Sequence, residues 1–133
     1  MRLSAVLAAA LALALSATAE AADAGEIAFN YCYSCHSVDP NEKDLPAPNL
    51  FGVLCRKPGS LKDFDYSPGM IAFAKKTRLW TPVLLEQYLA DPQAMVPDSP
   101  MELPPQLKSA EVRRDIVGYL KQHAGNAAKA CPK

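Results

Sequence analysis

The run Tyr31-Cys-Tyr-Ser-Cys-His36 decides how the rest of this 133-residue chain is interpreted. Two cysteines separated by two residues and followed directly by histidine form the element that attaches a c-type haem. The two thiols add across the porphyrin vinyl groups, and the following imidazole can take one axial face of the iron. On the last turn of a helix, this spacing lets both sulfur atoms reach one porphyrin edge. We therefore expect one covalent haem c, attached through Cys32 and Cys35, with His36 as an axial ligand.

Two other uses of a Cys-x-x-Cys pair are less consistent with the sequence. A thioredoxin-like redox site needs a preceding strand and a βαβ context, and no such pattern is found. A zinc site would need four donors from Cys and His close in space. The remaining candidates, Cys55, His123 and Cys131, have no paired spacing.

The first residues have the pattern of an export signal. An unbroken apolar run covers residues 5–15 after Arg2, and small residues follow it. These residues fit cleavage after Ala19 or Ala21. The apolar run is too short to span a bilayer comfortably. We therefore expect residues 1–19 to be a removed signal peptide and the mature protein to reach the periplasm.

Length and charge limit the possible architecture and partners. Residues 20–133 are enough for one domain, and a buried haem would supply apolar area that so small a core otherwise lacks. The chain has a formal net charge of zero, with 14 basic and 14 acidic residues. Nothing in this balance indicates a nucleic-acid partner. We expect a monomeric, monohaem domain.

Helix starts and stops are clear in the mature chain, and no alternating strand pattern longer than a few residues occurs. Asp23 and Glu26 predict a first helix that continues to about Cys35. Other helices are expected to begin at Ser67-Pro68, at Thr81-Pro82 with an end at Asp91-Pro92, and at Ser109 with Gly125 just past the end. The fold class is all-α, with about four to five helices.

Two Pro-rich stretches separate these helices. Residues 36–67 predict an irregular loop, and the chain after Pro92 predicts a second one. A loop as long as the first is uncommon inside a compact domain. A bulky cofactor gives it something to pack against.

The chain resembles the class I cytochromes c, of the mitochondrial type and its bacterial periplasmic relatives. The resemblance runs from Gly25 to about Gln122, and its pieces follow the family's order. After the Cys-x-x-Cys-His element come Pro48-Asn-Leu-Phe-Gly52, Arg56-Lys-Pro-Gly59, Phe64-Asp-Tyr66, Leu79-Trp-Thr81, Leu85-Glu-Gln-Tyr-Leu-Ala-Asp-Pro92, Val96-Pro-Asp-Ser-Pro-Met101 and Asp115-Ile-Val-Gly-Tyr-Leu-Lys121.

The resemblance implies that Met101 is the sixth ligand of the iron, because the family's ligand follows a short Pro-containing run. From the residues alone, Met70 and Met95 are also candidates, and His123 could in principle make a bis-imidazole site. A thioether ligand favours ferrous iron and electron transfer, whereas an open face invites ligand chemistry.

The resemblance also implies roles for five residues around the cofactor. The Pro48 carbonyl would accept a hydrogen bond from the axial imidazole and fix its orientation. Tyr66 and Trp80 would bind an inner propionate, and the Arg56 guanidinium would offset its charge. Tyr88 would lie near the ligand sulfur. Trp80 and Tyr88 are also compatible with a plain role in the core.

Four departures from the family pattern matter. Phe29 precedes Cys32 by three residues, where the family has an aromatic residue four before its first cysteine. Either Ala28 takes over that contact with the last helix, or the approach to the motif is one residue shorter. The segment Glu102-Leu-Pro-Pro-Gln106 is stiffer than a glycine-containing loop, which should discourage loss of the methionine ligand.

The two cysteines outside the haem element, Cys55 and Cys131, predict a disulfide in an exported chain. It would contribute on the order of 4 kcal/mol in the chain-entropy model. Two free thiols, or a link between chains, are the alternatives.

The family's lysines around the haem edge are missing. Tyr31, Gln93, Ala94 and Pro100 stand at the matching positions. Because such lysines steer acidic partners over long range, their loss predicts weak salt dependence.

The resulting expectation is a diffusible periplasmic electron carrier that is not an enzyme. Its donor would be a membrane quinol-oxidising complex or a periplasmic dehydrogenase, and its acceptor an oxidase or a photosynthetic reaction centre. The alternatives are a haem subunit docked to a larger dehydrogenase, and a peroxidase or gas-binding protein with a labile sixth ligand.

Overall fold

The structure is a computed structural model that describes residues 24–126. The predicted signal peptide, the cap residue Asp23 and Cys131 lie outside the described residues. Helical residues 24–29 are followed by α2 (Pro68–Lys76), α3 (Pro82–Ala90), α4 (Pro92–Met95), the 3-10 helix η1 (Pro105–Lys108) and α5 (Ala110–Gln122). Residues 24–126 contain no strand, as expected for the all-α class.

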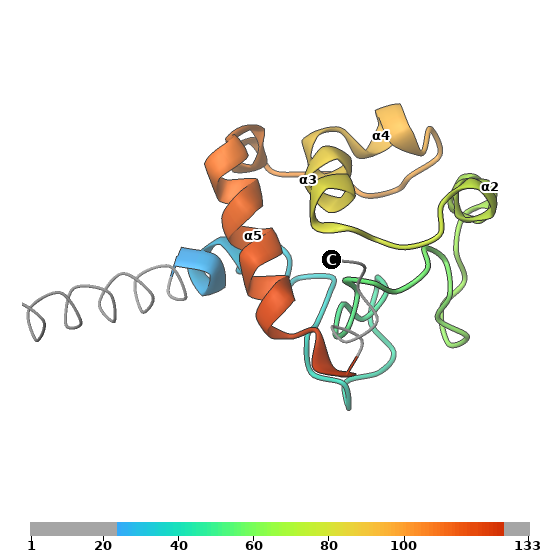
Figure 1. The fold of residues 1–133 in the computed structure, drawn as a ribbon, viewed down its shortest axis with the longest axis horizontal. Coiled ribbons are helices and arrows are strands. Elements are labelled where there is room, and N and C mark those ends of the chain that lie inside the picture. Colours follow the sequence, from blue (N-terminus) through green and yellow to red (C-terminus); the bar gives the residue numbers. More distant parts are fainter. Residues whose placement is uncertain (1–23, 127–133) are drawn as a thin grey trace, which may run out of the picture.

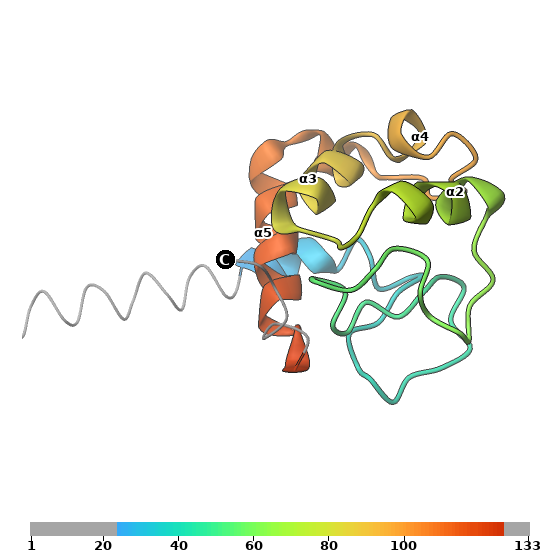
Figure 2. The same cartoon turned by 45° about the vertical axis from the view of Figure 1, so that its right-hand side comes forward.

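The helices surround a region that the long loop closes from the other side. In Figures 1 and 2, α2, α3 and α4 lie together along one side of the molecule, and the loop of residues 36–67 lies along the opposite side. The helix α5 runs along one end and crosses the first helix. Within residues 24–126, no helix is both long and apolar enough to cross a membrane.

Side-chain caps explain where three helices begin. Ser67 Oγ accepts from the Met70 amide at the start of α2, and Thr81 Oγ1 accepts from the Leu84 amide at the start of α3. In each case proline occupies the first turn, as predicted. Asp91 Oδ1 accepts from the Ala94 amide at the start of α4.

The second Pro-rich loop is present at residues 96–104, but the prediction missed the two short helices that flank it, α4 and η1. The Asp91-Pro92 pair that ends α3 also begins α4. An acceptor followed by proline is the same signal that identified α3. Ser109 stands at the N-cap of α5 as expected, but its side chain makes no capping hydrogen bond.

The first helix ends earlier than predicted. Its helical residues stop at 29, and hydrogen-bonded turns cover residues 30–35. The Cys32 amide donates to the Phe29 carbonyl at 2.8 Å, and the His36 amide donates to the Cys32 carbonyl at 2.9 Å. These bonds still bring both cysteines and His36 into one compact turn.

The crossing of the first helix and α5 depends on Phe29 and Gly25. Phe29 is fully buried, and its ring centroid lies 5.0 Å from that of Tyr119. Phe29 itself therefore makes the contact with the last helix, although it stands one residue nearer to Cys32 than in the family pattern. A Cβ atom at Gly25 would lie 3.0 Å from the Asp115 carbonyl oxygen, so the helices approach each other closely there.

Candidate haem site

A cavity of about 470 Å³ lies between the helices and the long loop. Its lining includes four residues that the sequence analysis singled out for haem attachment and iron binding: Cys32, Cys35, His36 and Met101. The cavity also takes in parts of α2 and α3. Residues that are far apart in the sequence therefore meet around one space.

His36 is held as a neutral imidazole. The ring is buried, and its Nδ1 atom lies 2.7 Å from the Pro48 carbonyl oxygen, so Nδ1–H donates and Nε2 keeps a lone pair. Burial lowers the pKa of His36, and the bond to Pro48 opposes that shift only in part. The expected contact between Pro48 and His36 is present, and it prepares Nε2 to bind a metal.

The two motif cysteines both carry free thiols. Cys32 is buried and Cys35 is exposed. Burial, followed by the charge of Cys35, raises the pKa of Cys32 to about 11. Neither sulfur is committed to a disulfide, so both are available to form thioether links.

Two polar residues that the sequence analysis did not assign to the site hold the loop that carries Met101. The Gln93 side-chain amide donates to the Met101 carbonyl at 2.7 Å and to the Ser99 carbonyl at 3.1 Å. Ser99 Oγ lies 2.9 Å from the Tyr88 hydroxyl and accepts a longer bond from the Met101 amide at 3.4 Å. From the sequence, Gln93 stands only at the position of a missing lysine, and no local pattern indicates a role for Ser99.

The other methionine candidates differ in position. Met70 in α2 also lines the cavity. Met95 is partly buried against the hydrophobic core. His123 does not line the cavity: its Nδ1 lies 2.9 Å from the Tyr119 carbonyl oxygen, and its ring packs against that of Tyr119.

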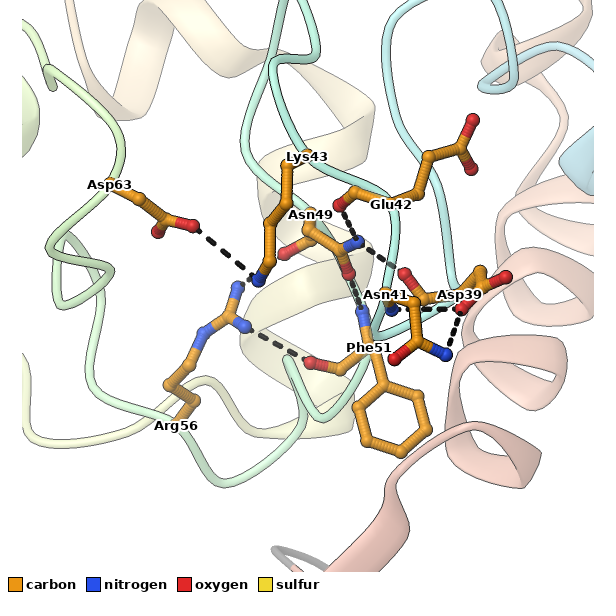
Figure 3. Close-up of polar contacts among 8 residues, drawn as sticks. All are labelled: Asp39, Asn41, Glu42, Lys43, Asn49, Phe51, Arg56 and Asp63. Carbon is orange, nitrogen blue, oxygen red and sulfur yellow. Dashed lines mark hydrogen bonds and ion pairs between the residues drawn. The ribbon is translucent and has the colours of Figure 1, made fainter.

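Arg56 lines the cavity and braces the long loop. Figure 3 shows its guanidinium, which donates to the Phe51 carbonyl at 3.0 Å and to the Asn49 carbonyl at 2.9 Å. Burial lowers the pKa of Arg56, while the nearby Tyr66 and Asp63 oppose that shift. Arg56 remains a cation at neutral pH because the ordinary pKa of a guanidinium is so high.

Tyr66 and Trp80 also line the cavity. Burial raises the pKa of Tyr66, so its hydroxyl is a neutral donor at neutral pH. Trp80 is buried, and its backbone pairs with the loop, since its amide donates to the Arg56 carbonyl at 2.9 Å. Their contact with a propionate stays a prediction.

Cys55 is buried, has a positive φ of 67° and is disulfide-bonded. Its predicted partner, Cys131, lies outside the described residues, so the pairing stays a prediction.

Residues 24–126 contain no group of three or more His, Cys, Asp and Glu side chains that could hold a metal ion.

Comparison with known proteins identifies the family. The chain is 36% identical to cytochrome c-550 of Paracoccus versutus, and the match covers 93% of this chain and 90% of the relative. Cytochrome c2 of Blastochloris viridis is 32% identical, with 85% and 86% covered. The chain belongs to the bacterial class I c-type cytochromes. No family model matches this cytochrome.

The fold of the cytochrome agrees with that assignment. The solved structure of cytochrome c2 from Rhodospirillum centenum matches it with a TM-score of 0.68 at 31% identity. That match covers 77% of this chain and 98% of the other. As a class I cytochrome c, the protein carries one covalently bound haem c and acts in electron transfer.

The residues present fit a haem c. Two free thiols with the required spacing line an otherwise largely apolar cavity, next to a neutral imidazole with an available nitrogen. A thioether lines the same cavity, as a second axial ligand would. Arg56 supplies a cation, which suits a cofactor that carries propionates.

Proposed function

We propose that this cytochrome is a periplasmic one-electron carrier whose haem iron is bound axially by His36 and Met101. In this proposal Cys32 and Cys35 form the thioether links. The observation that carries it is the cavity that these four residues line together. The protein would perform no bond chemistry on a substrate.

The bound haem c would supply the change between ferric and ferrous iron. The chain's own residues would keep the iron environment constant during that change. His36 is oriented by its 2.7 Å contact with Pro48, and the Met101 carbonyl is held by Gln93. Since neither ligand would leave, little of the protein would rearrange on electron transfer.

Three residues would bind the propionate side of the cofactor. We propose that Tyr66 and Trp80 donate hydrogen bonds to an inner propionate and that Arg56 offsets its charge. The support is that all three line the cavity and that Arg56 is tied to the loop through Asn49 and Phe51. A partly buried cation near a carboxylate lowers the cost of burying that charge.

Export would follow from a cleaved signal peptide at residues 1–19. The apolar run and the small residues Ala17, Ala19 and Ala21 support this proposal. A Cys55–Cys131 disulfide would suit an oxidising compartment.

The proposed donor is a quinol-oxidising membrane complex or a periplasmic dehydrogenase, and the proposed acceptor is an oxidase or a reaction centre.

Substitution of the two methionines that line the cavity tests the ligand assignment. The oxidised wild-type protein should show the weak long-wavelength absorption band of iron–methionine coordination, and carbon monoxide should leave the reduced spectrum unchanged. Met101→Ala should lose the band and bind carbon monoxide, whereas Met70→Ala should behave like the wild type. The proposal fails if Met101→Ala keeps the band, or if the wild type binds carbon monoxide rapidly at neutral pH.

A further inference from the structure

The Asp98 carboxylate joins the loop that carries Met101 to the start of α2. One carboxylate oxygen, Oδ1, accepts a hydrogen bond from the Ser67 hydroxyl at 2.9 Å. The other, Oδ2, accepts from the Gly69 amide at 2.8 Å. Asp98 thus binds two groups about 30 residues earlier in the chain with both of its oxygens.

Gly69 leaves the space that this carboxylate occupies. A Cβ atom at position 69 would overlap the Asp98 carboxyl group, with Oδ1 as the nearest atom. Gly69 does not have a positive φ, so its backbone conformation alone does not require glycine. The close approach of Asp98 is the feature of the structure that excludes a side chain there.

The contact is more than a cap for α2. Ser67 Oγ already caps that helix by accepting from the Met70 amide at 3.2 Å. Asp98 accepts from the Gly69 amide, which also lies in the first turn of α2 and has no partner within the helix. The helix dipole favours a negative charge at this end. Because Asp98 belongs to the loop that carries Met101, its two bonds connect that loop to α2 in addition to capping the helix.

We propose that Asp98 is a positioning residue that holds the Met101 loop over the haem. This inference rests on the proposed ligation of the iron by Met101. Ser99 follows Asp98 directly and is bonded to Tyr88, and Met101 comes two residues later. Release of Met101 from the iron would require this loop to move, and the two carboxylate bonds oppose movement away from α2.

Imidazole binding by the ferric holoprotein measures how readily Met101 is displaced. Asp98→Ala removes both bonds and should raise the apparent affinity for imidazole. We expect an increase of only about fivefold, because the bonds lie at an exposed position where water weakens them. Asp98→Asn should give a smaller increase, since its amide keeps one acceptor oxygen. Carbon monoxide binding by the ferrous protein should accelerate in the same order.

A double-mutant cycle with Gly69 makes the test specific. Gly69→Ala in the wild-type background should displace the carboxylate and raise the imidazole affinity about as much as Asp98→Ala. In the Asp98→Ala background the same substitution should have no further effect on imidazole binding. There it should stabilise the fold, because alanine is a better helix former than glycine.

A control variant separates a specific effect from general destabilisation. Thr81→Ala removes the hydroxyl that caps α3 through the Leu84 amide and leaves the Tyr88–Ser99 bond between α3 and the Met101 loop in place, so it should weaken the fold without changing imidazole affinity. Equal effects of Thr81→Ala and Asp98→Ala would overturn the positioning role in favour of general destabilisation.

The Met101→Ala protein shows which proposal has failed. If it binds imidazole and carbon monoxide readily while Asp98→Ala matches the wild type, the role of Asp98 is wrong and the ligand assignment stands. If it matches the wild type as well, the proposed function fails together with this inference.

Discussion

The hydroxyl groups of Tyr88 and Ser99 lie 2.9 Å apart in the interior of the protein. Tyr88 belongs to α3, and Ser99 belongs to the loop that ends at Met101. Both residues are buried, at 8% exposure each, so neither hydroxyl can readily exchange its partner for water. Burial also raises the pKa of Tyr88, which stays neutral at neutral pH. This buried bond holds the loop on the side of the cavity, whereas Asp98 holds it through exposed bonds.

Ser99→Ala should destabilise the protein and leave the Tyr88 hydroxyl without its partner. A buried group that loses its hydrogen bond costs about 1–3 kcal/mol. Chemical denaturation of the holoprotein measures the change in unfolding free energy. Ser60→Ala, at an exposed loop position, is the matched control and should be close to neutral. Equal stability of the two variants would show that the Tyr88–Ser99 bond contributes nothing.

Gln93→Glu should loosen Met101. The Gln93 amide donates to two backbone carbonyls, and a carboxylate of the same shape has no proton to donate there at neutral pH. We expect the unfolding free energy to fall by about 1–2 kcal/mol. The long-wavelength band should also disappear at a lower imidazole concentration than in the wild type. Gln93→Met keeps the length without the charge and should have a smaller effect. Identical imidazole titrations for Gln93→Glu and the wild type would contradict this role.

Gly25→Ala should weaken the crossing of the first helix and α5. The added methyl group would meet the Asp115 carbonyl oxygen at 3.0 Å and Tyr119 Cβ at 3.1 Å. Overpacking of this kind costs about 1–3 kcal/mol. Gly118→Ala is the control on the exposed side of α5, where an added Cβ meets nothing within 4 Å. It should stabilise the helix by up to about 1 kcal/mol. The prediction is wrong if thermal unfolding shows both substitutions shifting Tm in the same direction.

Tyr119 should make the fold sensitive to alkaline pH. Burial, and then the hydrogen bond to Tyr33 with an oxygen–oxygen distance of 2.8 Å, raise the pKa of Tyr119 above its ordinary value of 10.0. The unfolded chain therefore loses this proton first. The stabilising contribution is complete below pH 10 and decreases as the pH rises above it. In the ferrous protein, Tyr119→Phe should make the decline of unfolding free energy above pH 10 less steep. An unchanged slope would show that the Tyr119 proton is not linked to folding.

Electron exchange should depend only weakly on salt. Tyr31, Gln93, Ala94 and Pro100 stand where lysines ring the haem edge in the mitochondrial type, and all four are exposed. Without those charges, long-range steering of an acidic partner should be small. Stopped-flow rates with an acidic redox partner should change by less than about threefold between low and physiological ionic strength. Gln93→Lys should increase that dependence, and a steep dependence in the wild type would refute the prediction.

Local chemistry let the sequence predict much of the fold. The helix starts at Ser67-Pro68 and Thr81-Pro82 were predicted correctly because a cap and its amide are only three residues apart. The helix α4, which the sequence did not predict, carries the same signal at Asp91-Pro92, a pair that also ends α3. The Cys-x-x-Cys-His spacing likewise determined the cofactor, since one short turn holds all three groups.

The tertiary structure alone decided how the Met101 loop is held. The bonds from Asp98 to Ser67 and Gly69, and from Tyr88 to Ser99, join residues 11 to 31 positions apart. Such contacts depend on how helices and loops pack around the cavity, and no local spacing encodes them. Phe29 shows the same limit, because only the packed helices reveal that its ring reaches Tyr119. The sequence by itself determined which groups are chemically available, while the packing of distant segments determined which of them meet.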